Sequence, residues 1–212
     1  LFIRKSDNHT KVWEGEKLSK KQANELSGID SIYFIDDFKD ILSSIATKVD
    51  TFYINKNEHY RANSPVETRE DRFISWLLKK YPAHNVAKSN PILQRQRSIK
   101  HPDEIDQIKK ACDITRKGFN RVLEFIKPNV WEYEIEAEFI HEFINSSSKG
   151  FAYSPIIASG NDNNVLHYVK NNKQCKSGEL ILMDVGAEYG NYSSDMTRTV
   201  PVSGKFSKRQ KE

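Results

Sequence analysis

The sequence predicts two successive units that each combine helices with strands, a small α/β unit over residues 1–90 and a second unit over residues 91–212. Short runs of aromatic and β-branched residues in the first half are typical of buried strands, and apolar residues between them recur at helical spacing. A helix with a proline in its first turn opens the second half, and two strand-like runs near the end of the chain each carry an aspartate.

The first unit is predicted to contain two buried strands and two amphipathic helices. The strands are the runs SIYFI at residues 31–35 and TFYIN at residues 51–55. One helix begins after Asp37, between these strands, with apolar residues spaced three and four apart. The other covers residues 67–81 and ends at Tyr81, because the proline that follows disfavours the helical conformation.

A linker is predicted where the two units join. Residues 85–91, which contain Asn, Ser and Pro, are interpreted as this linker. Residues 92–99 are predicted to form a strand that leads into the second unit. The boundary between the units is therefore placed at residues 90 and 91.

The second unit is predicted to begin with two helices. Pro102 fits the first turn of a helix, and the two acidic residues after it complement the positive end of the helix dipole. Apolar residues continue at helical spacing until Pro128 breaks the pattern. A second amphipathic helix ends near Gly150, and residues 151–159 follow as a strand.

Asp184 and Asp195 are the most informative residues of the chain. They lie in two strand-like runs, residues 180–187 and 192–202, with a glycine suited to a tight hairpin turn between the runs. If Tyr189-Gly190 is a two-residue loop, Asp184 pairs with Asp195 across the strands. Cross-strand partners have Cβ atoms about 4.5–5.5 Å apart on one face of the sheet. The spacing therefore predicts two adjacent carboxylates.

Two carboxylates this close to each other need a compensating charge, because like charges repel and burial strengthens the repulsion. Apolar residues flank Asp184 in its strand, so we expect its carboxylate to be buried. Buried charges are paired or coordinate metals. Two divalent metal ions bridged by a carboxylate suit such a pair. On spacing alone, aspartates on a solvated sheet face are the alternative.

Composition narrows the partners and the compartment. The chain carries 33 Lys and Arg against 29 Asp and Glu, a net charge of +4 without a dense basic block, which argues against a nucleic-acid partner. Cys112 and Cys175 lack a paired or metal-like spacing, which suits a reducing compartment such as the cytoplasm. No apolar stretch approaches the roughly 20 residues that a membrane span needs. We therefore expect a cytoplasmic protein without a membrane partner.

Three segments carry a resemblance to a known family: HPDEIDQIKKACDITRKGF from His101, IIASGNDNNVLHYVKNN from Ile156, and GELILMDVGAEYGNYSSDMTRTVPVSGKFSKRQKE from Gly178. They resemble the metal-binding domain of aminopeptidase P, in the creatinase, prolidase and methionine aminopeptidase superfamily with the pita-bread fold. The resemblance implies an α/β N-terminal creatinase-like domain whose start is truncated. It also implies that the first half of an α+β pita-bread metallopeptidase domain follows, with its C-terminal half missing.

The resemblance also implies roles for individual residues. Asp184 and Asp195 match two of the family's five metal ligands, and His167 matches a histidine that contacts substrate and helps to stabilise the transition state. Tyr168 is a candidate substrate-binding residue beside it. The family's other ligands, one His and two Glu, lie further along than Glu212, so the chain alone is expected to be an inactive fragment. Whether a second chain supplies the missing half stays open.

The function implied by the resemblance is metal-dependent release of the N-terminal residue from peptides with proline in the second position. Two divalent ions are expected, Mn²⁺ because oxygen ligands favour hard ions, with Zn²⁺ or Co²⁺ as alternatives. The full-length protein is expected to form a homo-oligomer, a dimer or a tetramer. Two other functions stay open: a prolidase that acts on Xaa-Pro dipeptides, and a non-catalytic pita-bread protein that binds peptides or proteins.

Overall fold

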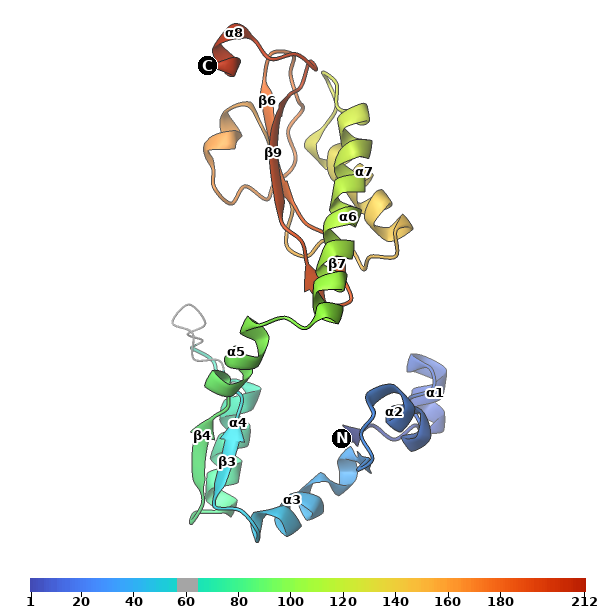
Figure 1. The fold of residues 1–212 in the computed structure, drawn as a ribbon, viewed down its shortest axis with the longest axis vertical. Coiled ribbons are helices and arrows are strands. Elements are labelled where there is room, and N and C mark those ends of the chain that lie inside the picture. Colours follow the sequence, from blue (N-terminus) through green and yellow to red (C-terminus); the bar gives the residue numbers. More distant parts are fainter. Residues whose placement is uncertain (57–64) are drawn as a thin grey trace. The chain divides into compact units, whose positions relative to one another are not determined.

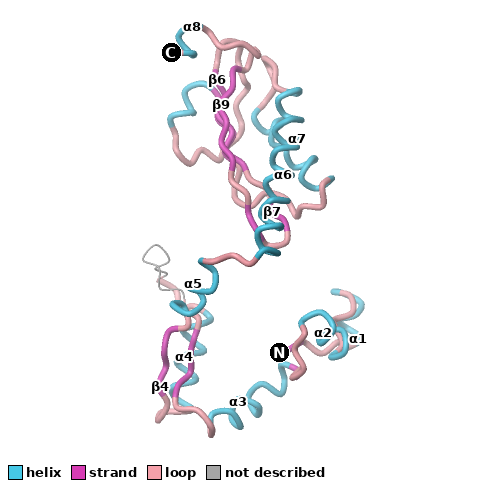
Figure 2. The backbone as a smooth tube through the Cα atoms, viewed as in Figure 1, coloured by secondary structure: helices cyan, strands magenta, loops and turns pink. Residues whose placement is uncertain are grey.

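A computed structural model describes residues 1–56 and 65–212, which form two compact units, Leu1–Ser98 and Ile99–Glu212 (Figure 1, Figure 2). The division follows Ser98, and the predicted boundary at residues 90 and 91 lies shortly before it. Each unit has its own buried core, so the two are described in turn.

The first unit contains two short parallel sheets with helices between their strands. β1 (Phe2–Ile3) pairs with β2 (Tyr33–Phe34), and β3 (Thr51–Ile54) pairs with β4 (Asn85–Lys88). A small core forms around Ala46, Phe52 and Leu77. The helical segments of this unit are α1 (Asn8–Glu14), α2 (Lys20–Ser27), the 3₁₀ turn η1 (Ile35–Asp37), α3 (Phe38–Ala46), α4 (Arg69–Lys80) and α5 (Asn90–Ser98).

Most of the elements predicted for the first unit are confirmed, including the strand at 51–55 and both helices, which are β3, α3 and α4. The linker predicted over 85–91 is wrong, because residues 85–88 form β4 and extend the sheet beside β3. The strand predicted over 92–99 is also wrong. The carbonyl of Ser89 accepts hydrogen bonds from the N–H groups of Ile92 and Leu93 in the first turn of α5, and Pro91 fits the same turn.

The second unit is a three-stranded antiparallel sheet with two long helices packed on one face (Figure 1). The sheet order is β5 (Ile156–Ser159), β6 (Leu180–Val185) and β9 (Met196–Pro201). The helices are α6 (Pro102–Phe125) and α7 (Glu132–Asn145). The other elements are η3 (Gly160–Asn164), β7 (Glu188–Tyr189), β8 (Tyr192–Ser193) and α8 (Lys208–Lys211).

Helix α6 begins where the sequence predicts it. The side chain of Glu104 accepts a hydrogen bond from the N–H of His101 at 2.7 Å, which caps the helix N-terminus. Gly118 brings α6 close to α7, because a Cβ at this position would lie 2.7 Å from the ring of Phe143. Phe139 and Phe143 are fully buried, and each such side chain contributes roughly 1.5–3 kcal/mol to stability. The two helices therefore pack closely against each other, and their buried side chains form one core with those of the sheet.

The strand predicted over 151–159 is shorter than expected, since β5 begins at Ile156. Pro155 has no N–H to donate to a neighbouring strand. Before it, Phe151 forms an isolated bridge with Ala187. The segment between the bridge and β5 leaves the sheet, and Tyr153 lies within it.

Candidate metal-binding site

Asp184 lies in β6 and Asp195 directly precedes β9, its antiparallel neighbour. In the connecting hairpin Tyr189 pairs with Tyr192, so the turn is Gly190-Asn191, with φ of +59° and +66°. The same register pairs Asp184 with Thr197. The predicted pairing of Asp184 with Asp195 is therefore wrong by two residues. Asparagine tolerates the left-handed backbone conformation, which lets the turn form one residue later than predicted.

The two aspartates nevertheless share one face of the sheet, because a register shift of two residues keeps every side chain on its face. The hydroxyl of Tyr153 lies 2.6 Å from Asp184 Oδ1 and 3.1 Å from Asp195 Oδ1, and it donates to both. One phenol oxygen therefore bridges the two carboxylates. The structure brings together the two residues that the sequence singled out, as diagonal neighbours.

Asp184 is half-buried and Asp195 is exposed, so the burial expected for Asp184 is wrong. Ile181, Met183 and Val185 of β6 are fully buried in the core with α6 and α7. Side chains alternate along a strand, so Asp184 faces the other side of the sheet. Apolar neighbours in the sequence do not bury this carboxylate, and both aspartates stay accessible to a ligand.

The bridging phenol is the main electrostatic feature of this pair. Burial raises the pKa of Tyr153, and the hydrogen bonds and charges of Asp184 and Asp195 raise it further. The phenol therefore keeps its proton and remains a hydrogen-bond donor. Among the described residues, the ion pairs of the second unit involve other carboxylates, so no protein cation neutralises the two aspartates.

Asp184 and Asp195 fit a divalent cation. Carboxylate oxygens are the ligands that hard cations prefer, and two of them converge here on an accessible face. They form part of a coordination shell rather than a complete one. In the part of the chain that the structure describes, no group of three or more His, Cys, Asp or Glu side chains comes together.

His167 lies in the loop between η3 and β6 and is exposed. The next residue, Tyr168, is 6% exposed, and its ring packs with Ile156, Ala158 and Leu182. Leu182 precedes Asp184 by two positions in β6, so the ring lies on the sheet face that carries the aspartates. The hydroxyl of Tyr168 donates to Glu132 at 2.8 Å. The expected roles of His167 and Tyr168 toward a substrate stay predictions.

Two polar residues of this region were not predicted from the sequence: Tyr153 as a bridge between the aspartates, and Glu132 as a buried acceptor. Tyr153 is 31 positions from Asp184, and Glu132 is 36 positions from Tyr168, so no local pattern records either contact. A signal did exist for Glu132. It precedes Ile135 by three positions, which places a carboxylate on the buried face of α7.

Replacing Tyr153 by phenylalanine is expected to lower the free energy of unfolding by about 1 kcal/mol or more in chelator-treated protein at neutral pH, because the aspartates lose their donor. The raised pKa adds a pH dependence. Above about pH 10, unfolded tyrosine loses its proton while folded Tyr153 keeps it, so stability falls as pH rises. Urea unfolding at pH 8 and pH 10.5 should give a smaller alkaline loss for Tyr153→Phe than for the wild type.

Tyr133→Phe is the control for this experiment, because Tyr133 is exposed and its ring stacks on Trp131. It should leave both the neutral stability and the alkaline loss unchanged. An alkaline loss of equal size in Tyr153→Phe and the wild type would show that the phenol does not hold its proton against the two carboxylates.

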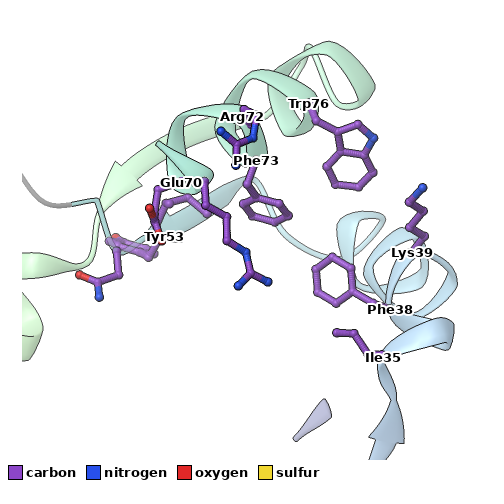
Figure 3. Close-up of a pocket in the computed structure, with 11 residues that line it drawn as sticks. Ile35, Phe38, Lys39, Tyr53, Glu70, Arg72, Phe73 and Trp76 are labelled. Carbon is purple, nitrogen blue, oxygen red and sulfur yellow. The ribbon is translucent and has the colours of Figure 1, made fainter. Parts of the chain in front are cut away.

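A concave surface lies wholly within the first unit, away from the aspartates in the chain. It is a cavity of about 700 Å³ between η1, α3, β3 and α4. Its walls are mainly aromatic and basic, and Glu70 is the one carboxylate among its described lining residues (Figure 3). Its described lining offers no pair of carboxylates, so Asp184 and Asp195 remain the candidate metal ligands. Prominent lining residues are Phe38, Lys39, Tyr53, Arg72, Phe73 and Trp76.

Comparison with known proteins matches both units. Residues 106–212 match the model of metallopeptidase family M24, and residues 1–53 match that of the aminopeptidase P N-terminal domain. The chain is 31% identical to the Xaa-Pro aminopeptidase of Haemophilus influenzae, covering 100% of this chain and 47% of that protein. It is also 31% identical to human Xaa-Pro aminopeptidase 3, covering 100% of this chain and 41% of that protein.

The solved structures that match this chain include two of aminopeptidase P. Aminopeptidase P from E. coli in a low-pH form matches 99% of this chain and 48% of its own, with a TM-score of 0.87 and 29% identity. Proline aminopeptidase P II from Yersinia pestis matches 96% of this chain and 47% of its own, with a TM-score of 0.85 and 28% identity.

The chain spans about half the length of the curated relatives it matches. The predicted fold class, a creatinase-like α/β domain followed by part of a pita-bread metallopeptidase domain, is confirmed. The M24 match covers half of the chain and includes both aspartates of the candidate site. The chain therefore belongs to metallopeptidase family M24.

Proposed function

We propose that the whole protein is a metal-dependent aminopeptidase that releases the N-terminal residue from peptides with proline in the second position. The observation that carries this proposal is the convergence of Asp184 and Asp195 on one accessible sheet face, where neither carboxylate takes part in the ion pairs found between described residues of the second unit. The relatives named Xaa-Pro aminopeptidase match this chain over its full length, which supports the proline preference.

Asp184 and Asp195 are the residues that hold the metal in this proposal. A bound divalent ion would supply Lewis-acid polarisation of the scissile carbonyl. Oxygen ligands favour Mn²⁺, with Co²⁺ and Zn²⁺ as alternatives. A Zn-substituted E. coli aminopeptidase P in complex with product has a matching fold, so zinc belongs among the metals to be compared.

The remaining residues act around the two carboxylates. Tyr153 donates to both acceptor oxygens and thereby fixes the direction in which the carboxylates point. His167 contacts the substrate carbonyl and donates a hydrogen bond as charge develops on the oxygen. The ring of Tyr168 would line the substrate site, because its hydroxyl is already engaged with Glu132.

The compartment and the oligomeric state also belong to this proposal. The whole protein acts on peptides in the cytoplasm, as a dimer or tetramer. Cys112 and Cys175 are both free thiols, which suits a reducing compartment. Among the helices that the structure describes, none combines the length and the apolar character needed to cross a membrane.

Peptide cleavage by the whole protein tests this function. Purified protein is incubated with three substrates: a tripeptide with proline second, the same tripeptide with alanine second, and an Xaa-Pro dipeptide. We expect release of the first residue from the proline tripeptide, loss of turnover with chelator, and recovery on addition of Mn²⁺. Residues 1–212 alone should give no turnover, since no third acidic, histidine or cysteine side chain among their described residues joins the two aspartates.

The other functions predict different results in the same assay. A prolidase would cleave the dipeptide and spare the tripeptide. A non-catalytic peptide-binding protein would bind the tripeptide without cleaving it in any metal. Turnover that resists chelator, or robust turnover by residues 1–212 alone, would contradict the proposed metal site.

A further inference from the structure

Glu132 is a fully buried carboxylate at the first position of α7. It accepts four hydrogen bonds: from Ser159 N at 2.8 Å, Ser159 Oγ at 2.7 Å, the Tyr168 hydroxyl at 2.8 Å and Lys173 N at 2.9 Å. A buried charge without such partners is very costly. Four donors use the full acceptor capacity of a carboxylate, and the N-terminus of α7 favours its negative charge.

The partners of Glu132 lie at both ends of one loop. Ser159 ends β5 just before the loop, and Lys173 lies near the far end, with His167 between them. The ammonium of Lys173 also pairs with Asp162 at 2.5 Å, which connects the far end of the loop to η3. Glu132 therefore joins a helix, a strand end and the segment that carries His167.

A second buried side chain anchors the same segment. Asn171 accepts a hydrogen bond from Ile157 N at 3.0 Å, and it donates to Glu136 Oε2 at 2.8 Å and Pro155 O at 3.0 Å. Glu132 reaches this loop from α7, whereas Asn171 lies in the loop and reaches to α7 and β5. Tyr168 is the anchored residue directly next to His167, since its ring is buried and its hydroxyl is bound by Glu132.

We infer that Glu132 is a positioning residue for His167. By holding the Tyr168 hydroxyl from the end of α7, it fixes the backbone on the C-terminal side of His167 and thus where the exposed imidazole is presented. This inference rests on the proposed function, in which His167 contacts the substrate carbonyl. Glu132 itself has no exposed surface, so it acts through Tyr168 and not on the substrate.

Tyr168→Phe in the whole protein is the mildest test, because the ring stays and only the donor to Glu132 is removed. We expect kcat for the proline tripeptide to fall about tenfold, the scale of one hydrogen bond to a charged group, with KM changed less. Glu132→Gln should act in the same way, because either orientation of its amide places the NH₂ group against a backbone N–H donor, that of Ser159 or that of Lys173. Tyr81→Phe is the matched control, since it removes a tyrosine hydroxyl that bonds Ser43 in the first unit.

Combination with His167→Ala separates positioning from general support of the fold. If Glu132 and Tyr168 act through His167, Tyr168→Phe should lower kcat in the wild type and leave the residual kcat of His167→Ala unchanged. A merely structural effect would lower both by the same factor. Equal factors, or wild-type kcat in Tyr168→Phe, would overturn the inference.

A readout without turnover keeps this inference independent of the proposed function. In chelator-treated whole protein with ¹³C-labelled histidine, the imidazole signal of His167 is the one that is missing from His167→Ala. Tyr168→Phe and Glu132→Gln should shift or broaden that signal, while Tyr81→Phe leaves it in place. An unmoved signal in both variants would refute the positioning role even in a fully active enzyme, and a shifted signal in an inactive protein would fault the proposed function alone.

Discussion

Replacing Asp195 by alanine is expected to abolish cleavage of the proline tripeptide by the whole protein while leaving its thermal stability nearly unchanged. The loss of activity should exceed the roughly 10–100-fold that removal of an outer-shell partner of a metal costs, because a ligand itself is lost. Asp195 is exposed, and substitutions at such positions usually change stability by no more than about 0.5 kcal/mol. Steady-state kinetics and thermal unfolding of the same preparation measure both quantities.

Asp106→Ala is the matched control. Asp106 is an exposed aspartate of α6 whose carboxylate pairs with Lys109 at 3.7 Å. This variant removes the same charge from the same unit and should keep full activity. Activity that survives the loss of Asp195, or falls equally in the two variants, would defeat the assignment of Asp195 as a metal ligand.

Replacing Gly186 by alanine is expected to destabilise the protein by more than about 3 kcal/mol, beyond the usual range for an overpacked core. A Cβ on Gly186 would lie 1.9 Å from the carbonyl oxygen of Ser194 and 3.0 Å from the ring of Tyr153. The first contact is with backbone, so the two segments that carry Gly186 and Ser194 must move apart. The second would displace the phenol that bridges Asp184 and Asp195, so Mn²⁺ affinity should fall as well. Urea unfolding and calorimetric titration with Mn²⁺ measure the two effects.

Gly178→Ala provides the comparison. Gly178 lies just before β6, whereas Gly186 directly follows it; a Cβ on Gly178 would meet no atom within 4 Å, but its φ of +86° is unfavourable for alanine. The expected loss is about 1 kcal/mol, without a change in Mn²⁺ affinity. Equal losses of stability for the two alanine variants would mean that close packing at Gly186 does not hold the aspartates in place.

The helices of the second unit could be predicted because their signals are local. Pro102 and the acidic residues after it mark the start of α6, and the apolar positions repeat at the helical period. The segment around Pro91 shows the opposite case. Its four-residue strand β4 is defined by pairing with β3, and its proline belongs to the first turn of α5 rather than to a linker. Pairing partners distant in sequence leave no such local mark.

The candidate site was predictable in part for a similar reason. A shift of the hairpin register by two residues keeps each side chain on its face of the sheet. Strand periodicity therefore places Asp184 and Asp195 on one face in the predicted register and in the observed one. The register itself depends on which two residues form the turn, and these are Gly190-Asn191 instead of the predicted Tyr189-Gly190. Tyr153 and Glu132 meet their partners through tertiary packing, so the helical pattern could place Glu132 on the buried face of α7 but could not reveal which residues either side chain contacts.

The metal content of the purified whole protein tests the role of the two aspartates most directly. After dialysis against Mn²⁺ and removal of the free ion, elemental analysis should find about two ions per chain in the wild type, as expected for a dinuclear hydrolase site. The double variant Asp184→Asn/Asp195→Asn should unfold at nearly the same temperature and retain no stoichiometric metal. Equal metal content in the folded variant and the wild type would contradict the assignment of Asp184 and Asp195 as metal ligands.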